Sequence, residues 1–164
     1  EHGPSVSRFR DYTIRKSSNP ERQAKYQFGQ ASNHLSFIRK DVIQFIEKNY
    51  RTDPSNRTYF GFSAGGLFGA YALMAQPDTF NNYILGSPDL EGDIPLLFSL
   101  ENMALKSKAQ DLNLFITYGE LENDLGGHVE DFITQLKNKN YQALSSIEQV
   151  VITVLDSFYS LVGL

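Results

Sequence analysis

Ser63 is the residue whose surroundings best fit covalent chemistry. It stands in the segment "GFSAG", which matches the pattern G-x-S-x-G. That pattern is typical of a sharp turn from a strand into a helix, where the small residues Gly61 and Gly65 relieve crowding and the serine hydroxyl stands clear of the core. The amide of Ala64, at the start of the helix, would donate to a developing oxyanion. The alternative interpretation is a plain turn in which Ser63 only caps the helix.

Three carboxylates follow a later strand. Glu120, Glu122 and Asp124 lie in "YGELEND", at or just beyond the carboxyl end of that predicted strand. Functional groups of α/β sheets gather at this end of the strands, so one of the three could orient and stabilise an imidazolium. A solvated acidic loop is the alternative interpretation of the same residues.

A general base is harder to find. The chain has three histidines, His2, His34 and His128, and none follows the last predicted strand, where the order serine, acid, histidine would put one. A serine hydroxyl without a base is a poor nucleophile near neutral pH. His128 could serve only if its loop folded back over Ser63.

Composition excludes several other kinds of function. The 164 residues include 15 basic and 19 acidic side chains without a basic stripe, so we expect no nucleic-acid partner. There is no cysteine and no histidine–glutamate metal motif, so we expect no metal and no cofactor. No apolar run reaches the roughly 18 residues of a membrane span, and we expect a soluble protein of the bacterial cytoplasm or periplasm. The oligomeric state stays open.

The elements that must position these groups alternate along one domain, residues 1–164. Residues 1–33 are polar and weakly periodic, so we expect an irregular lead-in before a core over 35–164. An amphipathic helix is predicted from apolar residues at three- and four-residue intervals, with Leu35, Ile38, Val42, Phe45, Ile46 and Asn49 on one side.

Strands are predicted at 57–62, 81–88, 112–120 and 148–155, with helices at 65–76, at 94–109 and around 129–136. Alternation of this kind predicts a parallel sheet flanked by helices. The strands are rich in Val, Ile, Phe and Tyr without strict alternation, which favours burial on both faces of the sheet.

These segments together resemble the esterase D-like "putative esterase" branch of the α/β-hydrolases, which includes siderophore esterases that cleave enterobactin- and bacillibactin-type triesters. "RFRDYT", the stretch from Leu35 to Pro88, and "YGELEND" carry the resemblance. It implies a three-layer α/β sandwich with a mostly parallel sheet and a small-molecule ester as substrate. It also implies Ser63 as nucleophile, Ala64 as oxyanion donor and Glu122 as acid, with Glu120 as the second choice.

The sequence departs from that family in two places. Aligning "YSLV" puts Phe158 where the family has its histidine, and a phenylalanine cannot accept a proton. The family also has a substantial portion before "RDYT", where this chain keeps residues 1–7, so we expect a shortened hydrolase fold. The expected function is serine-dependent hydrolysis of carboxylic esters, and the resemblance implies siderophore-type esters as a candidate substrate. The alternative is an inactive hydrolase-fold protein with a binding or structural role.

Overall fold

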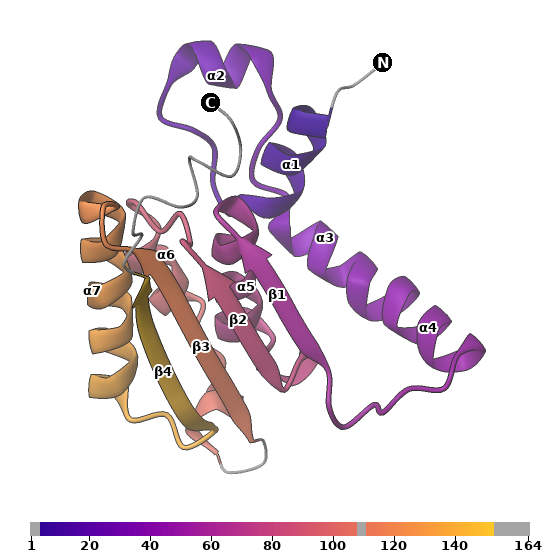
Figure 1. Cartoon of the computed structure of the whole chain (residues 1–164). Coiled ribbons are helices and arrows are strands. Elements are labelled where there is room, and N and C mark those ends of the chain that lie inside the picture. The colour runs from indigo at the N-terminus through magenta and orange to yellow at the C-terminus, as the bar shows by residue number, and fades with distance from the viewer. Residues whose placement is uncertain (1–3, 108–110, 153–164) are drawn as a thin grey trace, which may run out of the picture.

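A single parallel sheet organises the chain (Figure 1). The computed structural model describes residues 4–107 and 111–152, so the prediction for Phe158 lies outside the described residues. The strands stand in the order β1-β2-β3-β4, and each pairs in parallel with the next. Their bounds are Thr58–Phe62 for β1, Asn82–Gly86 for β2, Leu112–Gly119 for β3 and Leu144–Ile152 for β4. The α/β class and the parallel sheet are as predicted. The predicted burial on both faces of the sheet is wrong for β1, since Phe60 and Phe62 are 70 and 59% exposed.

Helices make the crossovers that parallel strands require. They are α5 (Ala64–Ala75), α6 (Ile94–Ser99) and α7 (Asn123–Lys139), with short 3-10 turns η2 (Pro77–Thr79) and η3 (Met103–Lys106). The helix predicted over 94–109 is therefore divided into α6 and η3, because Asn102 starts a new turn by accepting a hydrogen bond from the Ala104 amide.

One face of the sheet carries these three helices. Tyr59 of β1 packs its ring 5.9 Å from Phe68 of α5, and Gly69 of α5 lies against Leu85 of β2. Tyr118 of β3 donates a hydrogen bond of 2.6 Å to Glu130 of α7. The core lies between, and α5 is buried almost throughout, since it is apolar on all sides.

The lead-in is not irregular, and that prediction is wrong. It contains α1 (Pro4–Tyr12) and α2 (Pro20–Lys25), which lie at the carboxyl end of the sheet (Figure 1). Asn19 caps α2 by accepting from two backbone amides, and Pro20 occupies the first helical turn, where its missing N–H costs nothing. Tyr12 anchors α1 by packing against Phe68 at a ring distance of 5.8 Å.

The predicted amphipathic helix forms, but its apolar side divides. It consists of α3 (Ala31–Phe37), a π-helical turn η1 (Ile38–Val42) and α4 (Ile43–Asn49). Leu35 is buried and Ile38 packs against the core. The predicted inward position of the later apolar residues is wrong, since Val42, Phe45 and Ile46 are 38, 58 and 40% exposed. The π turn holds one extra residue, and this rotates the following turns away from the core.

Candidate active site

Ser63 occupies the turn between β1 and α5 in a backbone conformation that few serines adopt. Its φ is 55° and its ψ is −119°. A non-glycine residue in such a region is strained, and the strain persists only where neighbours fix it. Here the Ser63 N–H donates to Gly86 O at 2.9 Å, while its carbonyl accepts from the amides of Leu67 and Asp89 at 3.1 and 3.2 Å. Three hydrogen bonds thus hold the strained residue in place.

The Ser63 hydroxyl does not serve the helix that follows it. Ser63 makes no side-chain cap hydrogen bond to α5, and the residue is half-exposed. The backbone N–H of Ala64 donates to no acceptor among residues 4–107 and 111–152. The start of α5 therefore presents a hydroxyl and an amide next to each other, and neither has a hydrogen-bond partner among the described residues. This geometry suits attack on a carbonyl better than the capping interpretation.

The glycines of the turn differ in how much space a side chain would have. A Cβ at Gly61 would lie 2.3 Å from Gly65 O and 2.7 Å from a Tyr59 ring carbon, and a Cβ at Gly66 would lie 2.8 Å from Pro88. A Cβ at Gly65 would meet nothing closer than the Tyr59 oxygen at 3.8 Å. Tyr59 is itself fixed, because its hydroxyl donates to Gly65 O at 2.7 Å. Space therefore demands glycine at Gly61 and Gly66, and it leaves room for a methyl group at Gly65.

Glu122 is tied to the same turn through the end of β2. Its Oε2 accepts hydrogen bonds from the Ser87 hydroxyl at 2.7 Å and from the Gly119 amide at 2.8 Å. Ser87 directly follows Gly86, the residue that accepts from the Ser63 amide. The dipeptide Gly86–Ser87 therefore contacts both candidate catalytic segments, one through its carbonyl and the other through its side chain.

Ser87 is the site residue that sequence reasoning missed. Only 7% of Ser87 is exposed, and its φ is positive at 37°. Its N–H donates to Thr117 O at 2.7 Å, which fixes it at the carboxyl end of β3. The segment "GSP" ends the predicted strand, and a serine between glycine and proline at that edge is a signal for a structured turn.

The other two carboxylates of "YGELEND" differ from Glu122. Glu120 is exposed, and its side chain makes no hydrogen bond with any described residue; its backbone amide donates to Ile152 O at 3.0 Å. Asp124 is also exposed and lines a hollow of ≈ 610 Å³ together with Asp89. Only Glu122 is joined to the turn around Ser63 among these three residues.

The described residues bring no histidine into contact with Ser63 or Glu122. His34 packs between aromatic rings, 5.0 Å from Phe68 and 5.5 Å from Tyr12. Burial lowers the pKa of His34, and the Asp11 carboxylate only partly opposes that shift. His128 lies half-buried on α7, on the wall of the same ≈ 610 Å³ hollow that Asp124 lines.

A cleft of ≈ 250 Å³ opens beside Ala64, and the lead-in forms one of its walls. Arg15 fixes that wall to the loop after β2: its guanidinium lies 2.5 Å from Asp93 and donates to Glu91 O at 3.0 Å. Burial raises the pKa of Asp93, although the ion pair with Arg15 acts in the opposite direction. The lead-in thereby closes over one side of the candidate site.

The same wall offers aromatic and cationic side chains to the cleft. Phe9, Phe28, Lys16 and Arg22 all line it. Arg22 holds its guanidinium carbon 4.8 Å above the centre of the Phe9 ring, which is a cation–π geometry. Lys16 and Arg22 form no ion pair with a described residue, but the carboxylates of Asp89, Glu91 and Asp93 line the same cleft, so it carries charges of both signs.

Two further features concern metal ions and membranes. In the part of the chain that the structure describes, no group of three or more histidine, aspartate or glutamate residues is placed to hold a metal ion. Over residues 4–107 and 111–152, no helix combines the length and the apolar character that a membrane crossing needs.

Curated proteins with similar sequences are siderophore esterases. The ferri-bacillibactin esterase BesA of Bacillus subtilis (strain 168) is 32% identical over 140 residues, which cover 80% of this chain and 48% of that protein. The siderophore enterobactin esterase of Emericella nidulans is 36% identical over 64 residues, covering 38% of this chain and 21% of that protein. The chain thus spans at most about half the length of these two relatives, judged by the 48% that it covers of BesA.

Solved structures show the same architecture. The BES protein from Bacillus cereus matches with a TM-score of 0.77 at 23% identity, over 89% of this chain and 58% of that one. An IroE-like serine hydrolase from Shewanella oneidensis matches with a TM-score of 0.66 at 25% identity, over 88% and 50% of the two chains. These likenesses confirm the predicted α/β-hydrolase type of fold.

The family model described as "Putative esterase" matches residues 5–150, a span that contains the strained serine turn, the Gly86–Ser87 link and the carboxylate loop. The chain therefore belongs to this esterase family, as its sequence motifs predicted.

Proposed function

We propose that this chain is a carboxylic ester hydrolase that uses Ser63 as its nucleophile. The observation that carries the proposal is the strained backbone of Ser63, with φ 55° and ψ −119°, next to an Ala64 amide that donates to no acceptor in the described part of the chain. The Ser63 oxygen attacks the ester carbonyl, and the resulting oxyanion accepts a hydrogen bond from that amide. The tetrahedral intermediate then expels the alcohol and leaves an acyl-enzyme, which water hydrolyses.

Glu122 is the proposed acid of the site. Ser87 and Gly119 hold its Oε2, so its Oε1 remains available to accept an imidazole N–H. An imidazole oriented in this way would take the Ser63 proton during attack and return it to the leaving alcohol. The family resemblance puts Phe158 at the position of that imidazole, so in this chain solvent water takes the Ser63 proton and protonates the leaving alkoxide. We therefore expect a slow reaction that relies on the oxyanion donor and on substrate binding.

The proposed substrate is an ester with aromatic, negatively charged groups, such as a catecholate siderophore. Phe9 and Phe28 offer ring surfaces beside Ala64, and Lys16 and Arg22 offer positive charge in a cleft that Asp89, Glu91 and Asp93 also line. The aromatic rings favour planar aromatic groups over a simple short acyl chain, and the two cations can contact anionic oxygens on those groups. The names of the relatives, which describe bacillibactin and enterobactin esterases, support the same class of substrate.

Covalent labelling tests the nucleophile directly. A fluorophosphonate probe should label the folded chain at one residue, and Ser63→Ala should abolish that labelling without lowering the melting temperature by more than a few degrees. Labelling of Ser63→Ala to the same extent as the native chain would refute the assignment. Absence of labelling in both the native chain and the Phe158→His variant would also refute it.

Ester hydrolysis tests the acid and the base. Phe158→His should raise kcat/KM for an aromatic ester by about 10² to 10⁴-fold, which is the usual contribution of a placed general base. In that background Glu122→Gln should lower kcat strongly, whereas Glu120→Gln serves as the matched control because its side chain is exposed. Equal effects of the two substitutions would contradict the role of Glu122.

A further inference from the structure

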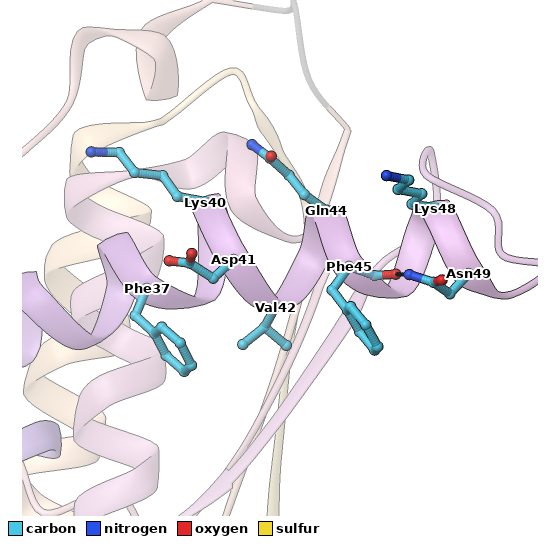
Figure 2. Close-up of a pocket in the computed structure, with 8 residues that line it drawn as sticks. All are labelled: Phe37, Lys40, Asp41, Val42, Gln44, Phe45, Lys48 and Asn49. Carbon is cyan, nitrogen blue, oxygen red and sulfur yellow. Dashed lines mark hydrogen bonds between the residues drawn. The ribbon is translucent and has the colours of Figure 1, made fainter.

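The helix formed by α3, η1 and α4 carries an apolar stripe that points away from the core. Phe37, Val42 and Phe45 project from the same side of this helix, and Figure 2 shows them pointing in one direction. Ile46 and Tyr50 continue the exposed apolar surface toward the end of α4. We call these five residues the helix stripe.

The π turn explains why the stripe is continuous. In a π turn, residues five positions apart lie one above the other, and the Ile43 amide accordingly donates to the carbonyl of Ile38. The spacing from Phe37 to Val42 is also five residues, so these side chains align across the turn. The spacing from Val42 to Phe45 is three, which keeps Phe45 on the same side of the regular helix that follows.

The exposed apolar area of the stripe is large enough for a stable contact. Phe37, Phe45 and Tyr50 are 53, 58 and 62% exposed. With about 200 Å² for each aromatic side chain, they present roughly 350 Å² of mostly apolar surface, to which Val42 and Ile46 add. A standard protein interface buries about 800 Å² on each partner, of which roughly 57%, about 460 Å², is apolar. The three aromatic residues therefore supply about three quarters of this apolar area, and Val42 and Ile46 supply much of the rest.

Charges at the two ends of the stripe are complementary under a two-fold rotation. A groove of ≈ 760 Å³ along the helix is lined by the stripe residues Phe37, Val42 and Phe45, by Asp41 and Lys48, and by Lys40, Gln44 and Asn49. Asp41 and Lys48 are exposed, and neither forms an ion pair with a described residue. They are seven residues apart, so they lie two turns apart on one side of the helix. Antiparallel pairing with an identical helix places each carboxylate beside an ammonium group.

We propose that the helix stripe is the interface of a symmetric dimer, in which α4 of a second copy of this chain packs antiparallel against α4. The two-fold axis passes between Gln44 and Phe45. Asp41 of each copy then pairs with Lys48 of the other, and the aromatic residues of the stripe are buried between the helices. A self-complementary patch of this kind closes as a dimer and does not continue into a filament. The proposal does not depend on the proposed ester hydrolysis.

Sedimentation equilibrium of the full 164-residue chain, from low to high micromolar concentration, tests the dimer. The native chain should approach the mass of two copies at high concentration. Phe45→Glu should weaken the association at least about tenfold, because it removes a central aromatic residue and introduces a charge. The matched control is Met103→Glu, since Met103 is 71% exposed but lies on η3, away from the stripe. It should leave the association constant unchanged.

A charge exchange tests the register of the two helices and does not depend on burial. Asp41→Lys should weaken the dimer, and the double variant Asp41→Lys with Lys48→Asp should restore it, because the exchange recreates both ion pairs. Circular dichroism shows whether each variant keeps its helices. A chain that stays monomeric at every concentration overturns the proposal, as does equal weakening by Phe45→Glu and Met103→Glu. A double variant no tighter than Asp41→Lys overturns the antiparallel register.

Discussion

Replacing the two glycines of the serine turn, one at a time, should have opposite effects on stability. In Gly61→Ala the added methyl group would lie 2.3 Å from Gly65 O and 2.5 Å from its carbonyl carbon. Neither obstacle can move easily, because Gly65 belongs to the first turn of a buried helix. Overpacking of this severity costs about 3 kcal/mol or slightly more. For a chain of this size, that lowers the melting temperature by roughly 6–12 °C.

Gly65→Ala is the matched control. Its methyl group would meet only the Tyr59 oxygen, at 3.8 Å, and Gly65 has no positive φ. Alanine in a helix gains up to about 0.5–1 kcal/mol over glycine, so the melting temperature should stay constant or rise by a few degrees. Thermal and urea unfolding of both variants measure the difference, and fluorophosphonate labelling should slow only in Gly61→Ala. A Gly61→Ala protein as stable as the native one, or a Gly65→Ala protein equally damaged, would refute this account of the turn.

Three further predictions concern hydrogen bonds and charges. Ser87→Ala removes the hydroxyl that donates to Glu122 at 2.7 Å, so urea unfolding should show a loss of about 1.5–3 kcal/mol, with slower labelling of Ser63. Hydrogen bonds from Lys106, Tyr141 and Lys139 lower the pKa of Glu101 from 4.5 to about 2. The Glu101 carboxylate therefore stabilises the fold above pH 4.5, and this contribution is lost as the pH falls toward 2. The urea midpoint of Glu101→Gln should vary less over that pH range than the midpoint of the native chain. Burial lowers the pKa of His34 below 6.5, so acidification below pH 6.5 should reduce the unfolding free energy, and His34→Gln should remove that dependence.

Most of the strand and helix pattern could be predicted because it depends on local signals. The run "TYFGF" has the β-branched and aromatic residues of a strand, and "GGLFGAYALMA" has the uniform apolar character of a buried helix. The start of β4 was less accurate: it begins at Leu144, four residues before the predicted 148, because pairing with β3 extends a strand whose own sequence is partly polar.

The wrong predictions for the long helix and the lead-in have different causes. A single-sequence pattern assumes a regular period of 3.6, so it could not reveal the π turn that carries Phe45 outward. In the lead-in, α1 is held by contacts with α5, and nothing local reports those contacts. For α2 a local signal was present in Asn19 and Pro20, a cap followed by a proline.

The candidate site could be predicted residue by residue, but its connections could not. The motif indicated Ser63, and the resemblance indicated Glu122 ahead of Glu120. That Ser87 holds Glu122 follows only from the positions of three successive strand ends, β1, β2 and β3. The crowding at Gly61, in contrast with the space at Gly65, also depends on how α5 returns across β1.

The strands lie in the sheet in the same order as in the chain, and this has a consequence for local opening. β1 and β4 are both edge strands of the described sheet, each paired on one side only. Residues of β4 from Glu148 onward are exposed, and so are Phe60 and Phe62 of β1. Amide hydrogen exchange should therefore be fastest in these two strands, and protection in β2 should report the global transition. Opening of β4 would leave the serine turn intact, whereas opening of β1 would displace Ser63, so the stability of the β1 edge limits how long the residues proposed for chemistry keep their places.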